Sequence, residues 1–216
     1  ASPSIVDCHI WDSGDGGISC VNGANPLIKR CRLVGNEGGI RVSDSSPTID
    51  GCKLASNRAA DGAGILVQGA SSPMIQNCQI HTNTSSGSGA AVSVLGTSSP
   101  TIQNCLIHAN ISSGSGGGIY VGSGASLAVI NSTVVDNSAV NSGGGIANMG
   151  SLLARNAIIY DNQASSGDDV YTQTSADIQY SCLGDFYPGV ANTVVEPKFT
   201  SASDFRLQSI STLIDA

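Results

Sequence analysis

Residues 99–121, SPTIQNCLIHANISSGSGGGIYV, decide the fold, because residues 72–94, SPMIQNCQIHTNTSSGSGAAVSV, form nearly the same sequence. Both stretches contain Pro-x-Ile-x-Asn-Cys-x-Ile-x-x-Asn, followed by a Ser/Gly-rich loop and a short apolar run. Self-similarity at a fixed period of about 20–50 residues is the signature of a repeat architecture. The rest of the chain is therefore aligned first on the Cys of this pattern.

The alignment extends the repeat through most of the chain. The Cys column comprises Cys8, Cys31, Cys52, Cys78, Cys105, Ser132, Ala157 and Ser181. A second column, nearer the Ser/Gly-rich loop, comprises Asn36, Asn57, Asn83, Asn110, Asn137 and Asn162. Apolar residues alternate with polar ones around both columns, which is the period of β-strands.

Each repeat thus contains three short strands separated by turns, and this pattern predicts one coil of a parallel β-helix. We expect an all-β solenoid of about eight coils over residues 1–183, with coils ~4.8 Å apart. A helical solenoid fits poorly, because the segments are β-branched and are interrupted by Gly, Pro, Ser and Asn. Residues 184–216 do not repeat and are expected to cap the C-terminal end.

Two columns have an expected structural role. Asn tolerates the left-handed backbone of tight turns, and stacked Asn amides can bond to the coils above and below, so the Asn column predicts a ladder. The five stacked cysteines, Cys8, Cys31, Cys52, Cys78 and Cys105, are expected to be buried free thiols. Their parallel side chains are poorly placed for disulfides, and one flat row cannot surround a metal tetrahedrally. Cys182, where the repeat degenerates, could face either way.

Composition excludes several classes of function. The net charge is −7, which argues against a nucleic-acid or anionic-membrane binder. No apolar run reaches the length of a membrane span.

The first repeat has no sequence that could cap it, so we expect an upstream segment or domain. Apolar residues at outward positions of the later coils need a cover, supplied by the tail, a partner or self-association: Leu106, Ile111, Tyr120, Ile130, Leu153, Ile158, Tyr160 and Tyr171.

The repeats resemble the right-handed parallel β-helix superfamily, which contains pectate lyases and many bacterial surface proteins. Gly117-Gly118-Ile119 and Gly143–Ile146, with HAN, VDN and YDN before the loops, resemble the repeats of polymorphic outer-membrane adhesins. The ending, IQYSCLGD…VVEPKF…DFRLQSISTLIDA, is similar to that of secreted bacterial proteins of the choice-of-anchor Q type. The resemblance implies an extracellular or cell-surface location, but it leaves activity open, because the superfamily includes lyases, hydrolases, adhesins and spacers.

Charged residues supply the candidate site. The basic residues are concentrated in the second and third coils, where Lys29, Arg32, Arg41, Lys53 and Arg58 could bind a polysaccharide. The acidic residues Asp12, Asp15, Glu37 and Asp61 lie in or near the neighbouring loops and could hold Ca²⁺, the one cofactor that a lyase would require. Arg41 or Lys53 would then be the base that removes a proton beside a uronate carboxylate. A solvated face of mixed charge is the structural alternative.

His81 and His108 occupy the same position in consecutive coils. Two stacked imidazoles could bind a metal, but we interpret them as surface turn residues.

Three functions remain open. The first is an extracellular structural, adhesive or glycan-binding rod, with a polysaccharide or surface glycan as partner. The second is a lyase or hydrolase of an acidic polysaccharide. The third is an ice or surface binder, which the irregular outward column Ser19, Arg41, Leu66, Ser93, Tyr120, Ala147 and Tyr171 disfavours.

Overall fold

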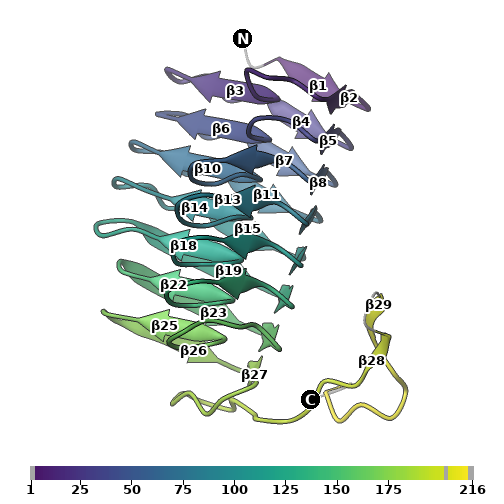
Figure 1. Ribbon diagram of the computed structural model, residues 1–216, viewed down its shortest axis with the longest axis vertical. Coiled ribbons are helices and arrows are strands. Elements are labelled where there is room, and N and C mark those ends of the chain that lie inside the picture. The colour runs from purple at the N-terminus through teal and green to yellow at the C-terminus, as the bar shows by residue number, and fades with distance from the viewer. Residues whose placement is uncertain (1–2, 202–203, 214–216) are drawn as a thin grey trace.

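The computed structural model describes residues 3–201 and 204–213, and it shows a rod of stacked β-coils (Figure 1). Each complete coil contributes one strand to each of three long parallel sheets. Two sheets contain eight strands and the third contains seven, so the rod has seven complete turns and a partial eighth. The expected all-β parallel β-helix is confirmed. Residues 214–216, the end of the motif similar to choice-of-anchor Q proteins, lie outside the described residues.

Sheets A and B follow each other around the coil. Sheet A comprises β1 (Ser4–Val6), β4 (Leu27–Lys29), β7 (Thr48–Asp50), β11 (Met74–Gln76), β15 (Thr101–Gln103), β19 (Ser126–Ile130), β23 (Ser151–Arg155) and β26 (Ala176–Gln179). Sheet B comprises β2 (His9–Trp11), β5 (Arg32–Val34), β8 (Lys53–Ala55), β12 (Gln79–His81), β16 (Leu106–His108), β20 (Thr133–Val135), β24 (Ile158–Tyr160) and β27 (Cys182–Leu183). Between the two strands of each coil, one residue adopts a left-handed backbone, for example Asn77 with φ 55° and Asn104 with φ 53°.

Sheet C closes the coil, and a smaller sheet D lies between sheets B and C. Sheet C comprises β3 (Ile18–Val21), β6 (Ile40–Ser43), β10 (Ile65–Gln68), β14 (Val92–Val94), β18 (Ile119–Val121), β22 (Ile146–Asn148) and β25 (Val170–Thr172). Sheet D comprises β9 (Arg58–Ala59), β13 (Thr84–Ser85), β17 (Ile111–Ser112) and β21 (Ser138–Ala139). Outside the coil, β28 (Phe199–Ser201) and β29 (Asp204–Leu207) form an antiparallel hairpin.

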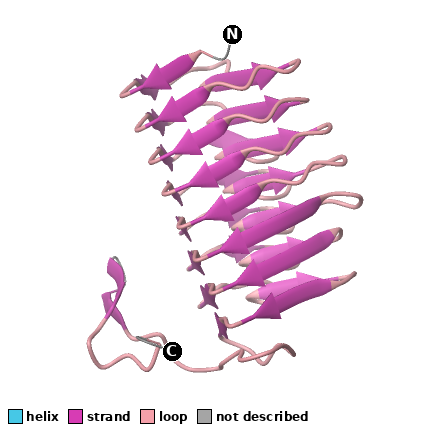
Figure 2. Ribbon diagram, turned by 180° about the vertical axis from the view of Figure 1, so that it is seen from behind, coloured by secondary structure: helices cyan, strands magenta, loops and turns pink. Residues whose placement is uncertain are grey.

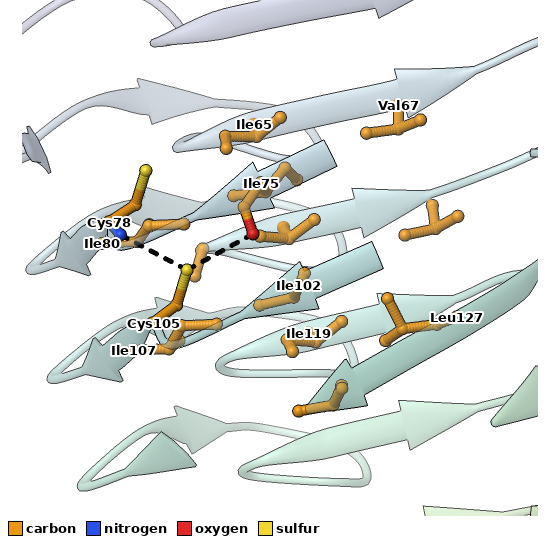
Figure 3. Packing of buried hydrophobic residues seen from close by; sticks show 14 of the residues in the cluster. Ile65, Val67, Ile75, Cys78, Ile80, Ile102, Cys105, Ile107, Ile119 and Leu127 are labelled. Atoms are coloured by element: carbon orange, nitrogen blue, oxygen red, sulfur yellow. Dashed lines mark hydrogen bonds between the residues drawn. The ribbon is translucent and has the colours of Figure 1, made fainter. Parts of the chain in front are cut away.

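The core consists of columns of like side chains, one from each coil. Ile75 and Ile80 of one coil lie above Ile102 and Ile107 of the next, and all four are fully buried (Figure 3). Burying such a side chain contributes about 1.5–3 kcal/mol relative to leaving it exposed. The strands register coil on coil with no slip at these positions, which keeps every outward residue in a column as well.

The Asn column forms the predicted ladder. Nδ2 of Asn110 donates to the Ile80 carbonyl at 3.0 Å and to Oδ1 of Asn137 at 2.9 Å. Its Oδ1 accepts the backbone N–H of Asn83 at 3.0 Å. Each amide thus satisfies buried backbone groups of the coil before it and bonds to the amide of the coil after it. The buried Asn of this ladder are Asn36, Asn57, Asn83, Asn110, Asn137 and Asn162.

Asp169 ends the Asn column. Its Oδ1 accepts from the backbone N–H of Asn162 at 3.2 Å and from the Asn162 amide at 2.9 Å. Its Oδ2 accepts the backbone N–H of Gly184 at 2.6 Å. The carboxyl is only 4% exposed, and this burial raises its pKa above 3.8.

The Cys column satisfies backbone donors at a different corner of the coil. Sγ of Cys105 accepts the backbone N–H of Cys78 at 3.4 Å (Figure 3). Oγ of Ser132 accepts the backbone N–H of Cys105 at 3.1 Å in the next coil. The buried free thiols of the column are Cys31, Cys52, Cys78 and Cys105. The expectation for Cys8 was wrong: it is exposed, because in the described chain no coil precedes the first one. Cys182 is buried and bonds to the Val195 carbonyl at 3.1 Å.

The segment after β27 folds across the last coil. Thr193 donates to the Ser181 carbonyl at 2.9 Å and accepts the Leu183 N–H at 3.1 Å, so it pairs with the free edge of β27. Tyr187 packs against the core. The chain then leaves the end of the rod, and β28 and β29 lie beside it (Figures 1 and 2). The described residues form strands and loops, and none of them belongs to a helix that could cross a membrane.

Candidate functional site

The basic residues that the sequence suggested as one ligand-binding group are spread around the rod. Lys29 belongs to sheet A, Arg41 to sheet C and Arg58 to sheet D, whereas Arg32 and Lys53 share sheet B. The outward positions in the sequence predict Arg32 above Lys53 on one strand face and Arg41 on another, and the strands have this arrangement because the chain turns a corner after every short strand. Residues close in sequence therefore point in different directions. Only Arg32 and Lys53 are neighbours, paired in register on β5 and β8.

Two basic side chains of the second coil are used in ion pairs between coils. Nζ of Lys29 lies 3.1 Å from Oδ2 of Asp50, and the Arg30 guanidinium lies 2.7 Å from Oδ2 of Asp7. Hydrogen bonds from Asn77 and Lys29 lower the pKa of the Asp50 carboxyl. These contacts hold adjacent coils in register, so we do not assign Lys29 to a ligand site.

The N-terminal half of sheet B carries a basic strip, which we define as His9, Trp11, Arg32 and Lys53. His9, Arg32 and Lys53 are paired in register on consecutive strands, and Trp11 is 60% exposed. The His9 and Trp11 rings lie 4.8 Å apart. In the part of the chain that the structure describes, neither Arg32 nor Lys53 forms an ion pair. Both cationic groups are therefore available to an external anion.

A groove of about 230 Å³ opens on the outer face of sheet C, and its lining includes Asp15, Glu37, Arg41, Asp61 and Leu66. In the first two coils the loops that lead into sheet C are short, residues 14–17 and 37–39. Longer loops, such as residues 86–91, lead into sheet C in the later coils. The groove is thus the part of sheet C that short loops leave uncovered.

The longer loops cover the same face in the next coils. Gly89, with φ 67°, packs so closely that a Cβ there would lie 2.4 Å from the Val92 carbonyl oxygen and 2.9 Å from Cα of Ser93. Ser93 is consequently fully buried, whereas Arg41 at the equivalent position in the second coil is exposed. The outward column of sheet C is therefore open at Arg41 and covered at Ser93.

The four acidic residues that could hold Ca²⁺ are not all in one place. Asp12 lies at a left-handed bend after β2, with φ 51°, and is not part of the groove lining. Asp61 accepts the Ser88 N–H at 2.6 Å and is engaged in a turn. Within residues 3–201 and 204–213, no three acidic, His or Cys side chains are grouped so that they could hold a metal ion. Asp15 and Glu37 line the groove without forming such a group.

The two candidate bases also lie in separate places. Arg41 lies in the groove on sheet C, whereas Lys53 belongs to sheet B. Only one of them could reach the reacting atom of a bound substrate. Of the two, Arg41 is part of the groove lining and Lys53 is not.

The His81 and His108 side chains are on strands and are half-buried, so their interpretation as surface turn residues was wrong. Their rings stack with centroids 4.9 Å apart and planes at 13°. Phe205 of β29 lies 5.0 Å from the His108 ring. This contact could not be predicted, because the repeat period does not indicate the path of a non-repeating tail.

The stacked sheets, the inward columns and the Asn ladder define the chain as a parallel β-helix protein. A family model described as right handed beta helix region matches residues 1–164. The chain therefore belongs to that family. Comparison with curated proteins and with solved structures gave no match.

Proposed function

We propose that this protein is a rod-shaped module that binds an anionic polysaccharide along the basic strip of sheet B. One observation carries the proposal: Arg32 and Lys53 lie in register on the same face as the exposed Trp11, and among the described residues neither forms an ion pair with a carboxylate. The β-helix itself supports a structural or carbohydrate-related rod. The anionic ligand is inferred from the chemistry of this face.

The chemistry of the strip suits a carboxylated or sulfated sugar. A guanidinium presents a planar fork of donors to a carboxylate or sulfate, and an ammonium adds a mobile charge. The Trp11 ring offers an apolar face on which a sugar ring can pack. Because coils are spaced ~4.8 Å apart, the strip repeats its charges along a line, which suits a polymer better than a single small anion.

We further propose that the protein acts outside the cell or on a bacterial surface, as a structural or adhesive element. The support is the resemblance of its repeats and its ending to secreted and surface β-helix proteins. A rigid rod with one recognition face could attach a surface to a glycan matrix without turning the glycan over.

The test is binding of polygalacturonate, dextran sulfate and neutral dextran to the intact protein by affinity electrophoresis. Replacing Arg32 and Lys53 together by Gln should weaken binding of the anionic polymers about tenfold, since two surface charge contacts contribute about 1.4 kcal/mol in total. The matched control replaces Arg41 and Arg58, which lie on other sheets, and should change affinity less than about twofold. Equal losses in both double variants, or tight binding of neutral dextran, would contradict the proposal. The two anionic polymers distinguish carboxylate from sulfate recognition.

A lyase remains the second candidate, and the groove beside Arg41 is the observation that favours it. With polygalacturonate or alginate as substrate, in the presence and absence of Ca²⁺, a lyase would produce unsaturated sugars that absorb ultraviolet light. We would assign the activity to the groove if Arg41→Ala abolished it and Lys53→Ala did not. No absorbance change with either polymer would reject this second candidate.

A further inference from the structure

The outer face of sheet B continues beyond the basic strip and passes beneath the C-terminal hairpin. His81 on β12 is in register with Ala55 on β8 and with His108 on β16. Lys53, the last member of the strip, lies on β8 as well. The two imidazoles are therefore the next basic groups along the face on which we place the ligand.

The hairpin covers His108, the second of these imidazoles, with an aromatic side chain. Phe205 contacts the His108 ring at a centroid distance of 5.0 Å, and Phe199 packs edge-on against Phe205 at 5.4 Å. His108 in turn stacks on His81. The hairpin and sheet B thus meet where Phe205 contacts His108, and His108 is stacked nearly parallel on His81. A neutral imidazole suits this apolar surrounding, whereas a charged one would lose hydration there.

The charges around the pair disfavour its protonation. Burial lowers the pKa of His81 to about 4, and His108 and Lys53 add to the effect. Burial and then Lys53 lower the pKa of His108. On the hairpin, Asp204 and Arg206 pair with each other at 2.6 Å.

A cavity of about 320 Å³ beside Phe205 is lined in part by ionisable residues from both the rod and the tail. These residues are Asp136, Tyr160, Asp161, Glu196 and Lys198. In the described chain, no ion pair links any of them to either imidazole.

We propose that the ligand-binding face extends across His81 and His108, and that the C-terminal hairpin occupies this extension until protonation of the two imidazoles displaces it. This inference deepens the proposed function and rests on it for the identity of the ligand as an anionic polysaccharide. The displacement itself is a property of the protein alone.

The direction of the response follows from the sign of the linkage. Both imidazoles are kept neutral in the docked state, so docking is favoured above the ordinary pKa of 6.5 and is weakened as the pH falls toward about 4. In the acidic state two stacked imidazolium groups and Lys53 would repel one another. Once the hairpin has left, these charges face solvent and can bind the same polymer that the strip binds.

Hairpin displacement can be measured without any ligand. The chain contains three phenylalanines, and labelling with 4-fluorophenylalanine gives one fluorine NMR signal for each. Phe186 is 82% exposed and serves as an internal reference, whereas Phe199 and Phe205 report on docking. Between pH 7 and pH 4 the latter two signals should move to the solvent-exposed position while that of Phe186 stays. Unchanged Phe199 and Phe205 signals would overturn the proposal.

Matched variants separate the imidazole pair from other acid effects. In the variant with His81→Gln and His108→Gln, which cannot be protonated, the Phe199 and Phe205 signals should no longer respond to pH. His9→Gln removes an exposed histidine that contacts Trp11. In this control the Phe199 and Phe205 signals should move with pH as they do in the wild type. Release in the double variant at the same pH as in wild type would show that the imidazoles do not control docking and would overturn the inference.

The final measurement is the affinity for dextran sulfate, which stays charged over this pH range. From pH 7 to pH 5 it should rise about tenfold in wild type, about 1.4 kcal/mol, and less than about twofold in the double His variant. If the hairpin is released but affinity rises equally in both proteins, the extension of the ligand face is rejected. If dextran sulfate and polygalacturonate bind at neither pH while the Phe signals still move, the proposed function fails and the displacement stands.

Discussion

The Asn column and the Cys column lie at two turns of the same coil, and both accept backbone N–H groups from the neighbouring coil. The Asn column keeps one residue type through six consecutive coils, whereas the Cys column changes to Ser132, Ala157 and Ser181. The difference follows from what each side chain must do. An Asn amide donates and accepts at once, and no other side chain of its size does both in this geometry. A Cys thiol accepts one backbone N–H and donates to a carbonyl, as Cys105 does to Gln103 at 3.2 Å, and a hydroxyl can do the same, as Ser132 does to Ile130 at 2.8 Å.

The largest effect expected from this comparison concerns Asn110→Leu. The substitution removes the acceptor of two buried donors of Asn83, the backbone N–H and the amide. Each stranded group costs about 1–3 kcal/mol, so the free energy of unfolding should fall by at least about 2 kcal/mol. Urea unfolding followed by circular dichroism measures it.

The control for that variant is Asn36→Leu near the N-terminal end of the ladder. Among the residues that the structure describes, the partly buried Ser13 N–H is the one donor to Oδ1 of Asn36. The loss should be about 1 kcal/mol, because water can reach the freed donor. Equal losses at Asn36 and Asn110 would show that position along the ladder is irrelevant.

An intermediate effect is expected at Asp169, where the Asn column ends in a carboxyl group. Burial raises its pKa above 3.8, so the folded state binds a proton more readily than the unfolded chain does. The stability from this group is present in full below pH 3.8 and is lost as the pH rises through the raised pKa. Unfolding in urea at a series of pH values should show this decrease, and Asp169→Asn should remove it. A slope that persists in Asp169→Asn would assign the dependence to other carboxyl groups.

The smallest effects are expected in the Cys column. Cys105→Ser should change the free energy of unfolding by less than about 0.5 kcal/mol, because Ser132 already fills this position in the next coil. Cys105→Ala removes the acceptor of the Cys78 N–H and should cost about 1 kcal/mol. A Ser variant less stable than the Ala variant would indicate that the column needs sulfur packing rather than an acceptor.

The same two columns explain how much could be predicted from the sequence. The Asn ladder follows from periodicity, because a repeated amide in a repeated turn has only one arrangement that satisfies every coil. Cys8 breaks its column because burial depends on a neighbouring coil on each side, which periodicity alone does not supply. The ion pair of Lys29 with Asp50 depends on side-chain direction, which periodicity does not supply. The contact of Phe205 with His108 depends on the path of the tail.

The pairing of Thr193 with the last strand gives the rod a defined response to mechanical load. Each coil is held mainly by the coil before and after it, so a pull on the tail reaches the last coil first. The bonds of Thr193 to Ser181 and Leu183 must open before that coil can detach. Beyond them the coils would peel away one at a time. The molecule would then lengthen in steps, and each step would dissipate mechanical energy. It would not unfold in a single event.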